Sequence, residues 1–223
     1  MAVADGQRAV DAHAEDPNRG ERRLSLTEGL VLCLVSEGPT YGLILAGLLA
    51  PDGSLGQIWS VPKGVVYYTL QQLELLGLIR MTPEQRTGSG RARSYCEITP
   101  TGRAAAEAWL RLPVDHVRDV RSELLVKLAL HDRTGSDSRP LVRAQLARLA
   151  PAAIALEDRL RTATGFERTM VLWRHEAMTV TLQFLTALAA RRRQGRRLSR
   201  GGGADASRGR PDPSGLRRSD RES

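Results

Sequence analysis

The stretch that decides the fold runs from residue 60 to residue 99. It reads SVPKGVVYYTLQQLELLGLI over 60–79 and RMTPEQRTGSGRARSYCEIT over 80–99. Ser60 is placed to cap a helix that has Pro62 in its first turn. Gly77 is placed to end that helix in a left-handed conformation. Between them, one apolar face recurs at helical spacing and predicts burial, formed by Val66, Leu70 and Leu73.

The opposite face of this helix carries polar groups. Its outward residues are Lys63, Gly64, Tyr67 and Gln71. Ammonium, phenol and amide groups are the donors and acceptors that bind phosphates and base edges in a major groove. We therefore expect this face to contact DNA.

A basic hairpin follows the helix directly. Gly88-Ser89-Gly90 supplies a flexible tip, and residues 95–98 alternate as a strand does, with Tyr95 and Glu97 opposite Cys96 and Ile98. Three arginines crowd the tip: Arg86, Arg91 and Arg93. Alone, such a cluster is usually a solvated turn. Directly after a DNA-facing helix it favours phosphate contact, and helix followed by basic hairpin is the order of a winged helix.

The segment from Leu24 to Arg111 resembles the winged-helix domain of the PadR family of bacterial transcriptional regulators. The motifs that carry the resemblance are SLTEGLVLCLVSEGPTYG (25–42), PKGVVYYTL (62–70) with LGLI (76–79), and ITPTGR (98–103). The resemblance implies that the helix bearing Tyr67 is the recognition helix. It also places the Tyr41-Gly42 pair after the first helix and turn, so Tyr41 joins the expected DNA contacts.

Five residues depart from the family pattern. Val65 stands where a small hydroxyl residue is usual, Gln71 and Gln72 stand in place of basic residues, and Leu75 and Leu76 stand where charges are common. The helix is therefore less basic than the family leads us to expect. This keeps a rival interpretation open, in which the winged helix docks on a protein partner and has little or no affinity for DNA.

The charge is distributed unevenly along the chain. The 223 residues have a net charge of +8, yet residues 24–103 contain six basic and six acidic side chains, and residues 191–223 contribute +7. The excess therefore lies in the C-terminal tail and not in the expected DNA-binding domain. The RRRQGRR cluster at 191–197 is either a solvated helix end or a nonspecific phosphate contact. Residues 1–23 and 194–223 are polar and predict disorder.

Several function classes are disfavoured. The four histidines are scattered, no Gly-rich loop follows a strand, and no metal-ligand spacing is present, so we expect no enzyme, metal or cofactor. The chain has no apolar run long enough for a transmembrane helix or signal peptide, and its two cysteines fit a reducing cytosol. As a DNA-binding protein it is expected in the cytoplasm, associated with the nucleoid. Cys33 lies among apolar residues and is expected to be inert, whereas Cys96 is the one candidate thiol switch.

Helix signals divide the rest of the N-terminal domain. Residues 25–28 form a capping box for a helix that ends at Gly38-Pro39. Thr40 is placed to cap a second helix to about Leu49. Thr99, followed by Pro100, is placed to cap another helix that runs to about Leu112.

The second half of the chain predicts three helices. The middle helix carries a heptad seam from Val142 to Leu160, in which Pro151 should kink or split it near 147–150. The last, Glu167 to Arg193, has two apolar stripes. One should pack within the subunit: Val171, Met178, Leu182, Leu185 and Ala189. The other should pack on a second subunit: Met170, Trp173, Ala177, Val180, Phe184 and Ala187.

Large apolar residues raise the question of a ligand site. Trp59, Trp109, Trp173, Phe166, Met170 and Met178 could line a cavity at a dimer interface. An ordinary packed core is the favoured interpretation of the same residues. A small-molecule effector of unknown identity stays open.

The expected fold is mainly α, with a winged helix-turn-helix DNA-binding domain over 24–112, including a small β-hairpin wing, and an all-α dimerisation domain over 113–193. The expected function is a homodimeric transcriptional regulator, more specifically a repressor. A two-fold dimer would place two recognition helices about 34 Å or a multiple of it apart and would bind a palindromic operator in double-stranded DNA.

Overall fold

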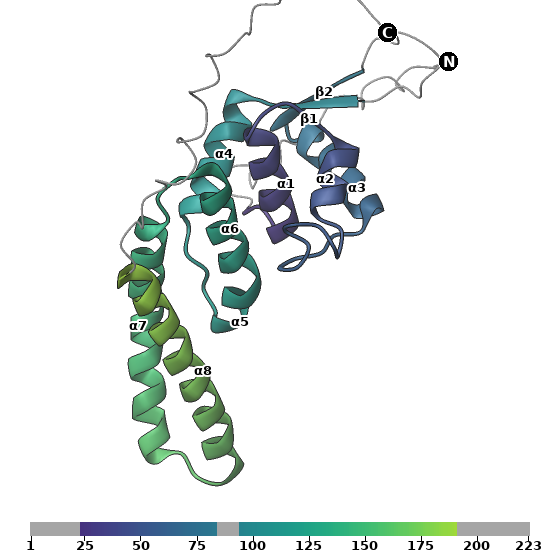
Figure 1. Ribbon diagram of the computed structural model, residues 1–223. Helices are drawn as coiled ribbons and strands as arrows, with labels where there is room; N and C mark the ends of the chain where they lie inside the picture. Colours follow the sequence, from purple (N-terminus) through teal and green to yellow (C-terminus); the bar gives the residue numbers. More distant parts are fainter. Residues whose placement is uncertain (1–22, 84–93, 191–223) are drawn as a thin grey trace, which may run out of the picture. The chain divides into compact units, whose positions relative to one another are not determined.

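The computed structural model describes residues 23–83 and 94–190 (Figure 1). Helix α1 (Leu26–Ser36) starts at the predicted capping box. The Ser25 side chain accepts a hydrogen bond from the Glu28 backbone amide, and the Glu28 carboxylate accepts one from the Ser25 amide. Residues 28–35 of α1 are all buried, so this helix forms the centre of the N-terminal part.

The segment after α1 differs from the prediction. Thr40 does not cap a helix, because Thr40–Tyr41 forms a short strand, β1, that pairs antiparallel with residues 95–96. Helix α2 (Gly42–Leu48) begins one residue later than expected, with Tyr41 at the cap position and no side-chain cap. The backbone groups of Thr40 are used by a strand that lies far away in the sequence.

Helix α3 (Lys63–Leu75) confirms the predicted stripe, with Val66, Leu70 and Leu73 buried. Its start is later than predicted: Pro62 occupies the cap position and Ser60 lies outside the helix. The reason is tertiary, because the amide of buried Val61 donates to the Leu49 carbonyl at 2.9 Å and holds this segment extended. Gly77 follows with φ +68° and turns the chain, as its position predicted.

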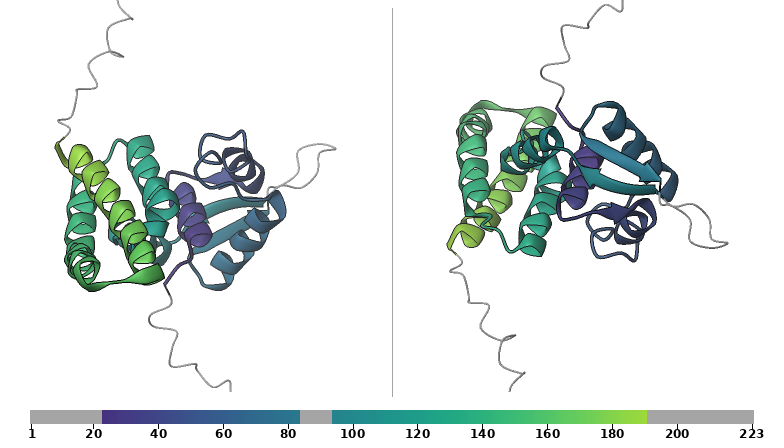
Figure 2. Two further views of the ribbon diagram at one scale, coloured as in Figure 1. Left: turned by 90° about the horizontal axis from the view of Figure 1, so that it is seen from below. Right: turned by 90° about the horizontal axis from the view of Figure 1, so that it is seen from above.

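A three-stranded antiparallel sheet supports the hairpin. Strands β2 (Ile79–Pro83) and β3 (Ser94–Ile98) pair with Ile79 opposite Ile98 and Met81 opposite Cys96, and the strand order is β1-β3-β2. Both views in Figure 2 show α1 lying against this sheet, as its contacts with β3 require. The predicted pairing of the two hairpin strands is confirmed, whereas the predicted tip, Gly88-Ser89-Gly90, lies outside the described residues. Strand β1 is an addition that the prediction missed.

Helix α4 (Pro100–Arg111) begins as predicted, since the Thr99 hydroxyl accepts a hydrogen bond from the Gly102 amide at 3.0 Å. Its Trp109 is buried against α1 at Gly29, where an added Cβ would lie 2.2 Å from the indole ring. Only glycine allows α1 and α4 to approach this closely. Trp109 is thus a core residue, as favoured from the sequence.

The C-terminal helices are α5 (Val117–Asp119), the π-helical turn η2 (Val120–Leu124), α6 (Leu125–Thr134), α7 (Arg139–Thr162) and α8 (Gly165–Ala190). Helices α7 and α8 pack side by side (Figures 1 and 2). Of the two effects predicted for Pro151, a kink or a split, the split is wrong, because α7 is continuous through this residue. Pro151 and Ala147 both lie on the solvent side, where water can satisfy the carbonyl that the proline leaves without a donor.

Side chains of α6 divide between two apolar clusters. Val126 and Leu130 pack with the helices of the winged-helix region, whereas Leu124, at the end of η2, and Leu128 pack with α7 and α8. The run from η2 to α6 therefore contributes to both cores. The boundary predicted at residue 112 falls just before this shared element.

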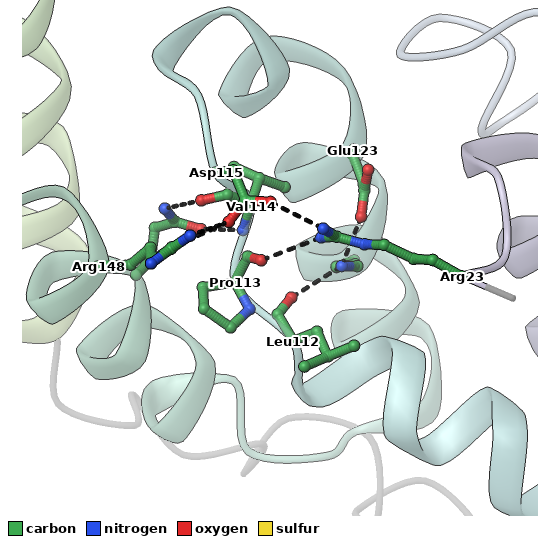
Figure 3. Close-up of polar contacts among 9 residues, drawn as sticks. Arg23, Leu112, Pro113, Val114, Asp115, Glu123 and Arg148 are labelled. Atoms are coloured by element: carbon green, nitrogen blue, oxygen red, sulfur yellow. Dashed lines mark hydrogen bonds and ion pairs between the residues drawn. The ribbon is translucent and has the colours of Figure 1, made fainter. Parts of the chain in front are cut away.

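The linker between α4 and α5 is held by polar contacts at four successive residues (Figure 3). Gln145 of α7 binds Val114 twice, accepting from its amide at 2.7 Å and donating to its carbonyl at 2.9 Å. Asp115 pairs with Arg23 at 2.8 Å and with Arg148 at 2.7 Å. Arg23 also donates to the Pro113 carbonyl. We call the contacts at these four residues, Leu112 to Asp115, the linker clamp.

Lys127 of α6 makes the remaining contact of the clamp, at Leu112. Its fully buried ammonium donates to the Leu112 carbonyl at 2.8 Å and to Glu123 at 2.7 Å, and it lies 4.5 Å from the centre of the Trp109 ring. Burial lowers the pKa of Lys127, while the hydrogen bond and charge of Glu123 oppose that effect. A carboxylate, a carbonyl and an aromatic face together compensate a charge that burial would otherwise disfavour.

Candidate nucleic-acid interface

The outer face of α3 presents the side chains that the sequence singled out. Lys63, Gly64, Tyr67 and Gln71 are all exposed, as predicted. The Lys63 ammonium lies 6.0 Å from the centre of the Tyr67 ring, and a Cβ added at Gly64 would meet nothing within 4 Å. The face is therefore accessible along its length, and its contact with DNA stays a prediction.

The Tyr41-Gly42 pair sits beside this face. A Cβ at Gly42 would lie 2.8 Å from Cε1 of Tyr67, so only glycine leaves room for that ring. Tyr41 packs edge-on against Tyr95 of β3, with ring centres 5.2 Å apart. The structure thus brings Tyr41 and Tyr67 to neighbouring positions on β1 and α3, and it gives the glycine of the pair a steric reason.

The described strands of the hairpin carry one basic and one acidic side chain, so they have no net charge. Arg80 lies opposite Glu97 in the β2–β3 register, and the Glu74 carboxylate accepts a hydrogen bond from the Met81 amide at 2.9 Å. The three wing arginines of the prediction, Arg86, Arg91 and Arg93, lie outside the described residues.

The structure supports the expectation for Cys33 and disfavours the one for Cys96. Cys33 is buried, and burial raises its pKa to about 12, as the prediction of an inert thiol requires. Cys96 is also buried, and both burial and the nearby Glu74 carboxylate raise its pKa. Because thiolates carry the reactivity of cysteine, these features disfavour the thiol switch considered for Cys96.

Helix α8 separates its two stripes as expected. Val171, Met178 and Leu185 are buried, and Met178 and Leu185 belong to the second apolar cluster. The other stripe is open: Trp173 is 75 % exposed, and Met170, Val180 and Phe184 are exposed as well, with Ala177 half-buried among them. This apolar surface, which we call the α8 stripe, is defined by Met170, Trp173, Ala177, Val180 and Phe184.

The six large residues considered for a ligand cavity do not line one in the subunit. Trp109 belongs to the first apolar cluster and Met178 to the second, while Trp59, Phe166, Met170 and Trp173 are exposed. The Trp59 indole donates to the Thr27 hydroxyl at 3.2 Å. A shallow hollow of about 550 Å³ does lie on α8, lined by Thr179, Leu182, Gln183, Thr186, Ala187 and Ala190. None of the six residues borders it.

Two other site classes find no support in the described ranges. Within residues 23–83 and 94–190, no three His, Cys, Asp or Glu side chains gather as a metal site needs. In the same ranges, no helix combines the length and apolar character that crossing a bilayer requires.

The α1–α4 framework, the sheet order and the exposed α3 define a winged-helix protein of mainly α structure, which confirms the predicted fold class. Residues 31–108 match the model of the transcriptional regulator PadR-like family, and the chain therefore contains a PadR-like domain. That family consists of transcriptional regulators and not of enzymes, in agreement with the sequence. Comparison with curated protein sequences found no match.

Solved structures that align with this chain include PadR of Bacillus subtilis in complex with operator DNA. It has 18 % identity and a TM-score of 0.39, and the alignment covers 74 % of this chain and 98 % of that one. A PadR-like transcriptional regulator from Bacillus cereus has 19 % identity and a TM-score of 0.35, covering 80 % and 98 %. These scores are too low to establish a common overall arrangement, so the family assignment rests on the matched domain.

Proposed function

We propose that the protein is a cytoplasmic, homodimeric repressor that binds a palindromic operator through α3 and the arginine-bearing wing. The observation that carries this proposal is the open face of α3 in a PadR-like domain, with Lys63 near the Tyr67 ring and that ring against Gly42, the residue after Tyr41. A cation and two phenols at the edge of a major-groove helix suit phosphate contact. Under this proposal, residues 24–112 bind DNA and residues 113–193 form the dimer interface.

The wing is proposed to supply most of the electrostatic attraction. Residues 24–103 carry no net charge, so the three arginines at the wing tip are its main concentration of positive charge. Each phosphate neutralised by a basic side chain releases counterions and steepens the salt dependence of binding. Loss of two such contacts should reduce the slope of log K against log salt by about 1.8.

The direct test uses a gel-shift titration on the DNA upstream of the protein's own gene, at several salt concentrations. Arg91→Ala with Arg93→Ala should weaken binding to all sequences and flatten the salt slope. Arg121→Ala with Arg143→Ala, two exposed arginines of the C-terminal helices, is the matched control and should leave both unchanged. Equal binding by wild type and the wing variant would refute wing contact.

The α8 stripe is proposed as the dimer interface, with a second copy of the chain as its occupant. Aromatic side chains carry roughly 150–250 Å² each, and a standard interface buries roughly 800 Å² per partner. The exposed Trp173 and Phe184, with Met170 and Val180, supply a large share of such an area. Contiguous exposed apolar patches often mark sites of interaction with another protein.

Sedimentation velocity tests this assignment. Trp173→Glu with Val180→Glu should convert the protein to monomers, because charges are strongly disfavoured in an apolar interface. Ile154→Glu, an equally exposed apolar position on α7, should leave the dimer intact. A wild-type chain that sediments as a monomer at all concentrations would contradict the proposal. Capture of a protein partner together with no DNA shift would favour the rival docking function.

A further inference from the structure

The residues of α3 that point most directly away from the core form a single uncharged row. The buried stripe is centred on Val66, Leu70 and Leu73. At 3.6 residues per turn, the opposite side of the helix is occupied at i, i+4, i+7 and i+11 by Gly64, Tyr68, Gln71 and Leu75. All four are exposed, with Tyr68 at 62 % and Leu75 at 79 %. We call these residues the outward row.

The cationic and phenolic groups discussed above lie on one flank of this row. Tyr67 turns toward Gly42 of α2, and Lys63 lies over its ring. That flank suits the phosphate backbone. When the helix lies in a major groove, the outward row and not the flank faces the base edges.

The chemistry of the row is selective for one kind of base pair. Guanine is read by arginine or lysine and cytosine by carboxylates, and the row contains neither. Adenine is read by a glutamine amide that donates to N7 and accepts from N6, and the thymine C5 methyl is read by apolar contact. We infer that the outward row selects A·T pairs, with the Gln71 amide on adenine and the Tyr68 ring on a thymine methyl. This inference rests on the proposed function.

Helix geometry limits which members take part. Tyr68 and Gln71 are three residues apart, about 4.5 Å along the axis, which places them over neighbouring base pairs spaced about 3.4 Å. Gly64 precedes them and has open space, so the backbone can approach the groove closely. Leu75 lies about 16 Å along the axis from Gly64. In helix-turn-helix proteins the N-terminal part of the helix contacts bases, so Leu75 falls outside the contact and serves as a control.

The test begins with selection of binding sites from a random double-stranded DNA library by the full-length protein. Selected half-sites should contain an A·T block at fixed positions. The best duplex is then synthesised with deoxyuridine in place of single thymidines, which removes only the C5 methyl, or with 7-deazaadenine, which removes only N7. Loss of the contacted methyl should weaken wild-type binding about fourfold. Loss of the contacted N7 should weaken it about two- to tenfold.

Variants assign each effect to a side chain. Tyr68→Ala should bind the methylated and unmethylated duplexes equally, whereas Tyr68→Phe should keep the methyl preference because it keeps the ring. Gln71→Ala should lose the sensitivity to 7-deazaadenine only. Leu75→Ala should retain both sensitivities. Each position is exposed, so these variants are expected to fold as the wild type does.

Failures of the two proposals are distinguishable. Tight sequence-specific binding with no sensitivity to any thymine methyl or adenine N7, or selected half-sites made of G·C pairs, would overturn this inference and leave DNA binding in place. Enrichment of no sequence, with no gel shift on any duplex, would overturn both. Capture of a protein partner that Tyr68→Ala and Leu75→Ala abolish, without DNA binding, would show that the row is a protein-docking face.

Discussion

Gln145 and Gln71 show how one residue type serves two opposite purposes in this molecule. Gln145 is fully buried and uses both ends of its amide on the backbone of Val114, within the linker clamp. Gln71 is exposed on the outward row, and within residues 23–83 and 94–190 no hydrogen bond involves its side chain. The first amide is committed to the fold, and the second is available to a partner.

The same contrast holds between the two regions as wholes. In the clamp, the described charges are matched inside the chain: Lys127 with Glu123, and Asp115 with Arg23 and Arg148. On α3 the polar groups face solvent, in a helix whose apolar stripe is fully used by the core. Substitutions in the clamp should therefore change stability, and substitutions on the outward row should change binding with little change in stability.

The largest expected effect concerns the reactivity of Cys33, which lies in the apolar core of the N-terminal part and reports whether that core is closed to solvent. Its pKa, raised from 9.0 to about 12, makes the thiolate fraction at pH 8 about a thousandfold smaller than in an unfolded chain. We expect Ellman's reagent to leave Cys33 unmodified in the native protein and to modify it at once in denaturant. A Cys96→Ser variant isolates the signal. Rapid native reaction of that variant would show that the core is open.

Removing the Lys127 ammonium should be the most destabilising change in the clamp. Lys127→Met leaves Glu123 and the Leu112 carbonyl without their donor, and loss of one partner of a buried pair costs about 3–5 kcal/mol. Because Glu123 is partly exposed, we expect the lower end, about 3 kcal/mol. Urea unfolding at fixed protein concentration measures this. Adding Glu123→Leu should recover part of the loss, and no recovery would contradict the pairing.

The two glutamines allow the comparison to be tested with one substitution. Gln145→Ala leaves the amide and carbonyl of Val114 unsatisfied in a buried place, at a cost of about 2–3 kcal/mol. Gln71→Ala removes an exposed side chain and should change stability by less than about 0.5 kcal/mol. Urea unfolding and DNA titration of both variants give the two readouts. A Gln71→Ala variant as unstable as Gln145→Ala would remove the distinction between the regions.

The parts of the fold that follow from local signals were predictable from the sequence. The capping box of α1, the buried stripe of α3 and the left-handed Gly77 each depend on residues within a turn or two of one another. The residues expected on the α3 face are exposed for the same reason, since helical periodicity alone assigns them to the side opposite the stripe.

Elements that depend on distant partners were not predictable in this way. Thr40 pairs with Cys96, and Val61 donates to Leu49, so the starts of α2 and α3 are set by tertiary hydrogen bonds and not by their own caps. Pro151 stays within α7 because that side of the helix faces solvent. The clamp joins residues from four separate segments, and nothing near Lys127 in the sequence distinguishes a buried lysine from an exposed one.

The smallest expected effect is a pH dependence at the exposed edge of the clamp. Hydrogen bonds from Arg23 and Arg148 lower the pKa of Asp115 below its ordinary value of 3.8. The folded state therefore keeps this carboxylate ionised to lower pH than the unfolded chain does. The resulting stabilisation is complete above the unfolded pKa and is lost as pH falls through the folded one. The difference in urea midpoint between wild type and Asp115→Asn should shrink as pH is lowered through this window.

The effect is small because all three side chains face solvent, where water and salt screen the pairs. Raising the ionic strength at neutral pH should therefore reduce the same difference in midpoint, whereas it should leave the larger loss in Gln145→Ala unchanged. Gln145 is uncharged and buried, so salt should not screen its hydrogen bonds. If salt reduced the losses in Asp115→Asn and Gln145→Ala equally, the contacts of Asp115 and of Gln145 would not differ in solvent access. The stability of the linker would then have to come from charge at both places.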